Sequence, residues 1–213
     1  MEFAICNGER RRPVETGDRA TCPCCKAEVV AKCGSVVSHH WAHRADDCDA
    51  WSEPESEWHR HWKGAFATTP ADNEVVIGPH RADVQRPSGV VVEIQKSPLS
   101  VDEVTERQDF YTRNAAGMVW LFSEDWLGTM RMRKDRDWKW DSKRKAARRA
   151  AVSVPFLIAS ARDVYQVTPA WSFSGTVPSF RFGLARVSSP CVVESMWTDF
   201  ARRRRFASLG VAP

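Results

Sequence analysis

The sequence predicts an α/β fold in which a central mixed sheet is flanked by helices, with a small zinc-finger-like segment before it and a basic, β-rich appendage after it. Between residues 53 and 122 the predicted order is helix, strand, strand, strand, helix, strand, which is typical of an α/β layer. Metal-ligand residue types gather ahead of this stretch, and basic residues dominate beyond it. We therefore expect three regions, at residues 1–50, 51–125 and 126–213.

Length and composition limit the class of protein. A chain of 213 residues can bury one sizeable core, or one core and a small satellite domain. No apolar run reaches membrane-spanning length, and charge follows Met1-Glu2-Phe3 where a secretory signal would be apolar. Seven cysteines are an odd number, which argues against a fully paired disulfide framework. We expect a cytoplasmic protein that does not bind membranes.

The net charge of +4 is unevenly distributed. Residues 126–213 hold 17 Lys and Arg against 6 Asp and Glu, a net charge of +11, whereas residues 1–125 have a net charge of −7. This asymmetry suggests a carboxylate-rich working half and a basic half that can hold a polyanion such as DNA. A solvated basic surface explains the same charge equally well.

The first element is a cysteine-rich segment that opens with Cys22-Pro-Cys-Cys25. A C-x₂-C turn aims two thiolates at one point and is the usual knuckle of a structural zinc site. The other ligands come from Cys33, His39, His40, His43 or Cys48, and we favour Cys22, Cys25, His43 and Cys48, with His40 as the alternate. Four protein ligands leave no open position, so the Zn²⁺ is expected to be structural. The competing interpretation is a small core of reduced cysteines.

A helix is predicted next, over residues 52–66, because Ser52 and Glu55 fit a capping box and Pro70 follows its end. Two stripes of ionisable side chains run along this helix, Glu57 with His61 and His59 with Lys63. Either stripe can face a site on the neighbouring sheet or lie in solvent.

Residues 81–95 read as two strands joined by a tight turn at Pro87-Ser88-Gly89, with Gly89 in the left-handed conformation. This turn would place Asp83 directly across from Glu93, with Gln95 on the same face as Glu93. Facing like charges destabilise a sheet, but a divalent cation between them reverses the sign of that interaction. The hairpin therefore predicts a site for Mg²⁺ or Mn²⁺ held by the two carboxylates.

The remaining elements complete the predicted layer. A strand begins at Glu74, Ser100 caps a helix over residues 101–113, and residues 118–122 form a strand that is apolar on both faces. Beyond residue 125, tryptophans and a basic helical run at 137–149 are compatible with nucleic-acid binding or with a docking helix. Short strands and a final helix over 197–206 follow.

The motifs, taken in order, resemble the competence protein CoiA-like family, which is grouped with the PD-(D/E)XK nuclease superfamily. The resemblance spans about residues 20–122. It rests on the cysteine-rich segment with His40-Trp-Ala-His43 and Cys48, then Ser56-Glu57-x-His59-x-x-x-Lys63, Arg81-x-Asp83, Glu93-Ile-Gln95-x-Ser97, Arg107 and Tyr111.

This resemblance implies a restriction-endonuclease-like core and a metal-dependent DNA nuclease, with Asp83 and Glu93 as the metal-binding acids. Gln95 stands where the superfamily usually has lysine; an amide cannot carry charge, so we expect it to orient the attacking water or a phosphate oxygen. Glu57 would complete the metal shell, and His59 would contact phosphate or relay a proton. The alternative is a catalytically silent nucleic-acid-binding accessory protein of recombination or DNA uptake, which the missing lysine favours.

Overall fold

The structure is a computed structural model that describes residues 1–35, 38–44, 48–124, 152–160, 163–174, 177–187, 189–190 and 192–208. The chain divides into two compact units, Met1–Pro87 and Ser88–Pro213, and each is described by itself. The predicted basic run at residues 137–149 lies outside the described residues.

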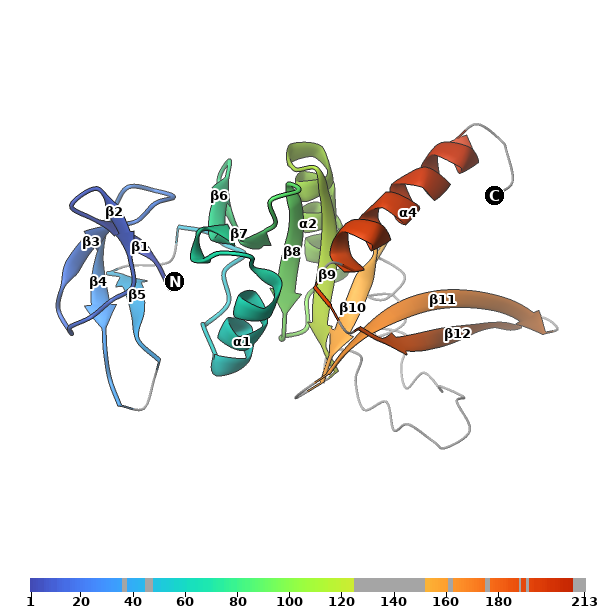
Figure 1. Ribbon diagram of the computed structural model, residues 1–213, viewed down its shortest axis with the longest axis horizontal. Coiled ribbons are helices and arrows are strands. Elements are labelled where there is room, and N and C mark those ends of the chain that lie inside the picture. Colours follow the sequence, from blue (N-terminus) through green and yellow to red (C-terminus); the bar gives the residue numbers. More distant parts are fainter. Residues whose placement is uncertain are drawn as a thin grey trace. The chain divides into compact units, whose positions relative to one another are not determined.

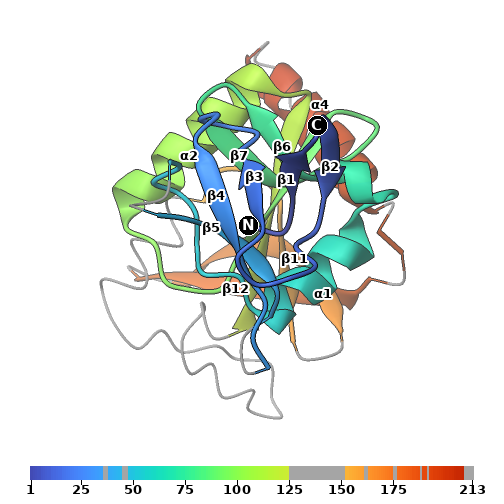
Figure 2. The same cartoon turned by 90° about the vertical axis from the view of Figure 1, so that its left-hand side faces the viewer.

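The first unit begins with a five-stranded antiparallel sheet in the order β2-β1-β3-β4-β5 (Figures 1 and 2). Its strands are β1 (Ala4–Cys6), β2 (Glu9–Arg11), β3 (Arg19–Thr21), β4 (Glu28–Lys32) and β5 (His40–His43). Alternation along β4 turns Val29 and Ala31 inward, where they pack with Trp41 and a few small residues. A core this small buries little apolar surface, and small segments of this kind are commonly stabilised by a bound metal.

The same unit continues with α1 (Glu57–Phe66), a short 3₁₀ helix η1 (Pro70–Asp72) and the antiparallel strands β6 (Asn73–Ile77) and β7 (His80–Gln85). The predicted helix start at Ser52 is wrong. Ser56 is the N-cap, and its side chain accepts a hydrogen bond from the backbone N–H of His59. Pro54 disfavours helical backbone at Glu53, and the helix begins only at Glu57.

The second unit opens with β8 (Val90–Gln95), α2 (Val101–Asn114) and β9 (Gly117–Ser123). β8 and β9 pair in parallel, with α2 as the crossover between them. Every residue of both strands is buried, as expected of a parallel pair with covered faces. Ser100 caps α2 in a capping box with Glu103, which confirms the predicted start.

The sheet then grows by β10 (Phe156–Ala159), β11 (Val164–Ser174) and β12 (Val177–Arg186), and the chain continues into α4 (Val192–Ser208). The predicted strands of this region are confirmed, but the prediction of a separate appendage is wrong, because β10 pairs in parallel with β9 and extends the same sheet. The fully buried β9 needs hydrogen-bond partners on both edges, and β10 supplies the second set.

Helices cover both faces of this sheet. In Figure 1, α2 lies behind β8 and β9 and α4 lies in front of them. Gly117 allows the close approach of α4, since a Cβ at this position would lie 2.1 Å from the ring of Trp197. A mixed α/β fold is thus confirmed. Among the described helices, none combines the length and apolar character that crossing a bilayer requires.

Candidate functional site

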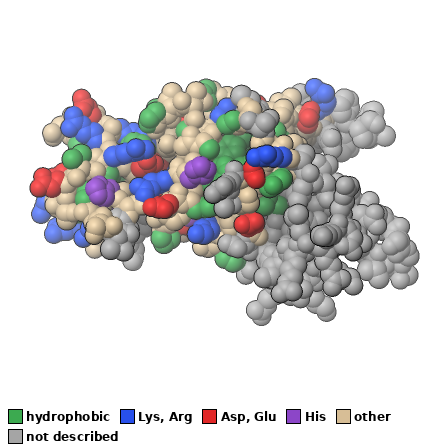
Figure 3. All heavy atoms as spheres, turned by 60° about the horizontal axis from the view of Figure 1, so that its bottom comes forward, with side chains coloured by type: hydrophobic (Ala, Val, Ile, Leu, Met, Phe, Trp, Pro, Cys, Tyr) green, Lys and Arg blue, Asp and Glu red, His purple; other side chains and the backbone are tan. Residues whose placement is uncertain are grey.

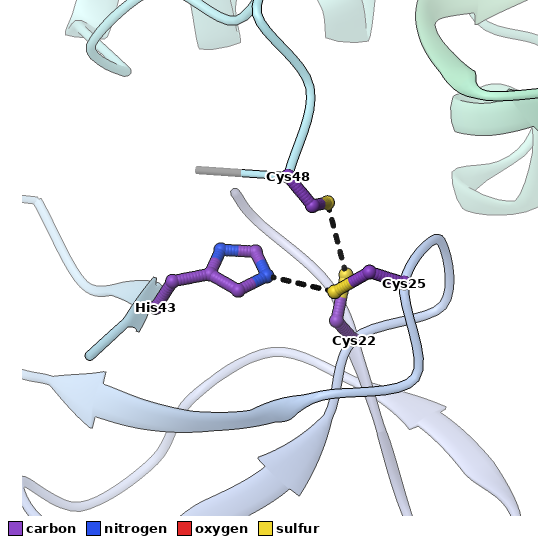
Figure 4. A group of neighbouring side chains, drawn as sticks. All are labelled: Cys22, Cys25, His43 and Cys48. Atoms are coloured by element: carbon purple, nitrogen blue, oxygen red, sulfur yellow. Dashed lines mark hydrogen bonds between the residues drawn. The ribbon is translucent and has the colours of Figure 1, made fainter. Parts of the chain in front are cut away.

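The structure brings together the four side chains predicted as zinc ligands. The metal-binding atoms of Cys22, Cys25, His43 and Cys48 all lie within 4.8 Å of one another. Figure 4 shows His43 and Cys48 directed toward the two thiols of the knuckle. Strand β5 supplies His43, the turn after β3 supplies Cys22 and Cys25, and Cys48 comes from the segment that leads to α1.

The spacing of these atoms fits one zinc ion. The Sγ atoms of Cys22 and Cys48 are 3.7 Å apart, and Cys25 Sγ lies 3.4 Å from His43 Nε2. In a tetrahedral site, usual Zn–S and Zn–N bond lengths place two sulfurs about 3.8 Å apart and a sulfur and a nitrogen about 3.6 Å apart. The sulfur–sulfur distance also excludes a disulfide bond, which is about 2.05 Å long. The cluster can therefore hold Zn²⁺ with a closed set of protein ligands.

Local hydrogen bonds shape the knuckle. The Cys24 backbone N–H donates to Cys22 Sγ over 3.4 Å, and the Lys26 N–H donates to the Cys22 carbonyl while Lys26 takes a φ of 64°. Burial, together with hydrogen bonds that the Cys48 thiol donates toward Cys22 and Cys25, raises the pKa of Cys48. Metal must then displace the thiol proton, so zinc binding would release protons.

His40, the alternate ligand, is directed elsewhere. It lies three residues from His43 on β5, so the two side chains leave opposite faces of the strand. The Nδ1 atom of His40 lies 2.8 Å from the Ser38 carbonyl oxygen.

A second cluster surrounds Asp83, and its centre is Lys63. The Nζ atom of Lys63 lies 2.9 Å from Glu55 Oε2, 3.3 Å from Glu74 Oε1 and 3.2 Å from Asp83 Oδ1. The Lys63 side chain is 5% exposed, whereas that of Asp83 is 24% exposed. Burial opposes the charge on Lys63, but Asp83, Glu74 and Glu55 outweigh it and raise its pKa. Asp83 thus shares a permanent cation with two buried acids.

Glu74 anchors this cluster to the start of the chain. Its carboxylate accepts hydrogen bonds from the backbone N–H groups of Glu2 and Phe3, while its own backbone has a φ of 50°. Burial alone would raise the pKa of Glu74, but Lys63 and Arg81 lead the interactions that lower it to about 2. Glu74 is therefore ionised and structural.

The acid that reaches Lys63 is Glu55, although the sequence pointed to Glu57. Glu57 is exposed at the start of α1 and lines an open groove of about 700 Å³ with Arg60, His61 and His39. Glu55 is almost completely buried, and its Oε1 atom has no hydrogen-bond partner among the residues that the structure describes. Sequence reasoning missed Glu55 because it was assigned to a helix cap; the acid-rich run before the helix was the available signal.

His59 is held inside the first unit. Its Nδ1 lies 2.8 Å from Ser56 Oγ and its Nε2 lies 2.9 Å from Glu53 Oε2. Since a carboxylate only accepts hydrogen bonds, Nε2 carries the proton that it donates to Glu53. Both ring nitrogens are thus engaged in positioning the start of α1.

Glu93 and Gln95 lie on β8 in the second unit and are both buried. Gln95 is 2% exposed; its Nε2 donates to the Ser97 carbonyl over 2.8 Å, and its Oε1 accepts from Arg107 Nη1 over 3.4 Å. This burial favours a structural role for the amide over the predicted contact with water or phosphate.

The predicted hairpin crosses the boundary between the units, so Asp83 belongs to one and Glu93 to the other. Gly89 has the expected left-handed backbone, with a φ of 79°. The convergence of Asp83 and Glu93 on one cation stays a prediction.

Comparison with known proteins gives no match among the curated proteins or the solved structures. One family model does match, at residues 10–50. This range contains all four residues of the cysteine–histidine cluster and confirms, for this part of the chain, the resemblance drawn from the sequence. The matching model is described as the competence protein CoiA, N-terminal domain, and residues 10–50 of this chain are similar to it.

Proposed function

We propose that this protein is a metal-dependent DNA nuclease associated with competence. Asp83 and Glu93 would hold Mg²⁺ or Mn²⁺, and the Cys22, Cys25, His43 and Cys48 cluster would hold a structural Zn²⁺. The match of residues 10–50 to the CoiA N-terminal domain supports the link to competence and DNA uptake. We place the protein in the cytoplasm, where reduced cysteines persist.

The observation that carries the catalytic proposal is the environment of Asp83. Its carboxylate is partly exposed, and one oxygen lies 3.2 Å from the buried ammonium of Lys63. The ion pair with Lys63 fixes the direction of this carboxylate, which a metal ligand requires. A purely structural ion pair would be expected to bury Asp83 as deeply as it buries Glu74.

Bound Mg²⁺ would polarise the scissile phosphate and lower the pKa of its water. The protein itself would contribute a carboxylate held in place, because the ion pair with Lys63 orients Asp83 while its side chain stays 24% exposed. Glu57 and His59 are not needed at this centre, because Glu57 lines a separate groove and His59 is bound to Glu53.

Binding of DNA would rest on phosphate contacts, which position a nucleic acid without reading its sequence. On the face shown in Figure 3, basic and acidic side chains are interspersed over the described surface. We therefore expect modest affinity from this part of the protein and assign the stronger contribution to the basic C-terminal region, residues 126–213.

The test is cleavage of plasmid and single-stranded DNA by the purified protein with Mg²⁺ or Mn²⁺, compared with Asp83→Ala. We expect cleavage by the wild type and its loss in the variant. Cleavage that persists in Asp83→Ala would place the site elsewhere or reveal a contaminating nuclease.

The burial of Gln95 favours a second candidate, an accessory protein that binds nucleic acid without cutting it. β8 contains no lysine, so this strand offers no positively charged side chain that could contact the scissile phosphate. Tight binding that weakens steeply as salt rises, without cleavage by the wild type, would select this candidate.

A further inference from the structure

The segment Cys48–Ser56, which we call the strap, connects the cysteine–histidine cluster to the N-cap of α1. It begins at a candidate zinc ligand, makes a turn in which the Ser52 backbone N–H donates to the Asp49 carbonyl over 3.1 Å, and ends in extended backbone at Ser56. Every second residue from Asp49 to Glu55 contacts β7 or α1 through its side chain. The strap therefore joins the two clusters described above within one unit.

The first two contacts hold β7. Asp49 is buried, and its Oδ2 accepts a hydrogen bond from the Arg81 backbone N–H over 2.7 Å. Its Oδ1 lies 3.0 Å from His80 Nδ1 and accepts from the Trp51 N–H. The Trp51 and His80 rings stack with centroids 3.3 Å apart. These bonds fix the strand two residues before Asp83.

The next two contacts hold α1. Glu53 binds the ring of His59, and Glu55 binds Lys63, which in turn binds Asp83. The strap is thus connected to Asp83 by two routes. Asp49 binds the backbone of β7 two residues before Asp83, and Glu55 binds Lys63, which contacts the Asp83 carboxylate.

We propose that Asp49 is a positioning residue that transmits the state of the zinc site to Asp83. The inference rests on the proposed function, since it needs Zn²⁺ at Cys48 and a role for Asp83. Cys48 and Asp49 are adjacent, so their Cα atoms are about 3.8 Å apart and a metal that fixes one backbone position restricts the other. Loss of zinc frees the end of the strap and loosens β7.

The experiment is hydrogen exchange measured by mass spectrometry on the full chain, with zinc content determined in parallel. Four samples are compared: wild type with zinc, wild type stripped by a chelator, and Asp49→Asn with and without zinc. Asp49→Asn keeps the shape of the side chain but removes one acceptor and the charge. The control is Asp72→Asn, whose carboxylate accepts from the Thr68 and Thr69 N–H groups and lies outside the strap.

We expect zinc removal to speed exchange in β7 at least tenfold, on the order of the loss of one charge-assisted hydrogen bond. Asp49→Asn should retain about one zinc per chain, show the same faster exchange in β7, and gain little more when zinc is removed. Asp72→Asn should respond to zinc removal like the wild type.

Several outcomes would overturn the proposal: absence of bound zinc, β7 exchange that ignores zinc, or effects of zinc removal and Asp49→Asn that simply add. If Asp49→Asn does not fold, His80→Phe replaces it, because it keeps the ring stack and removes the hydrogen bond to Asp49. Hydrogen exchange can be measured whether or not the protein cleaves DNA. Absence of cleavage would refute the nuclease proposal, whereas the coupling of Asp49 to the zinc site would still be tested by the exchange rates of β7.

Discussion

Glu74 offers the sharpest test of the Lys63 cluster, because its carboxylate is buried and its negative charge is stabilised by Lys63 and by backbone N–H groups. The Glu74 carboxylate accepts from two backbone N–H groups and contacts Lys63, and its pKa is lowered from 4.5 to about 2. One pKa unit corresponds to about 1.4 kcal/mol, so ionised Glu74 contributes about 3 kcal/mol to the free energy of unfolding at neutral pH. Because the folded-state pKa is the lower one, this contribution is complete above pH 4.5 and is lost as the pH falls toward 2.

The perturbation is Glu74→Gln, measured by urea unfolding with tryptophan fluorescence between pH 2 and pH 7. We expect the variant to lose about 3 kcal/mol at pH 7 and to show a flatter stability profile below pH 4.5. The control is Glu9→Gln, since the Glu9 side chain is 67% exposed and its ion pair with Arg11 should be worth less than about 1 kcal/mol. A loss below about 1 kcal/mol in Glu74→Gln, or an equal loss in the control, would refute the reasoning.

Three further predictions concern the zinc site, the Lys63 cluster and the sheet. Cys22→Ser should reduce zinc from about one per chain to none and lower the melting temperature; full folding without metal would contradict the site. Lys63→Met should lower the free energy of unfolding by about 3–5 kcal/mol, because Asp83 and its neighbouring acids lose their cation, whereas Lys63→Arg should cost less in the same urea titration. Gly117→Ala should cost about 1–3 kcal/mol because its methyl group would overlap Trp197, and an unchanged melting curve would contradict that packing.

Elements governed by local chemistry could be predicted from the sequence, and those governed by distant partners could not. The Cys22 knuckle, the left-handed Gly89 and the Ser100 cap each follow from a few adjacent residues. The start of α1 was misplaced because two serines offered caps four residues apart; Pro54 disfavours the first, and the contact of Glu55 with Lys63 could not be seen in the sequence. No sequence spacing shows that one lysine will meet acids from two strands.

The parallel pairing of β10 with β9 was missed for a related reason. The apolar composition of β9 predicted that both of its faces are buried, but its residues do not indicate which strand pairs with its second edge. The partner arrives more than thirty residues later in the chain, after a stretch that the structure does not describe.

The buried amide of Gln95 restricts which side chains position 95 can accept. Its two ends are matched to the Ser97 carbonyl and to the guanidinium of Arg107. A single replacement by lysine would press two cations together in a space where Gln95 is 2% exposed and Arg107 is 4% exposed. Lysine at position 95 is therefore expected to be unfavourable as long as Arg107 is present.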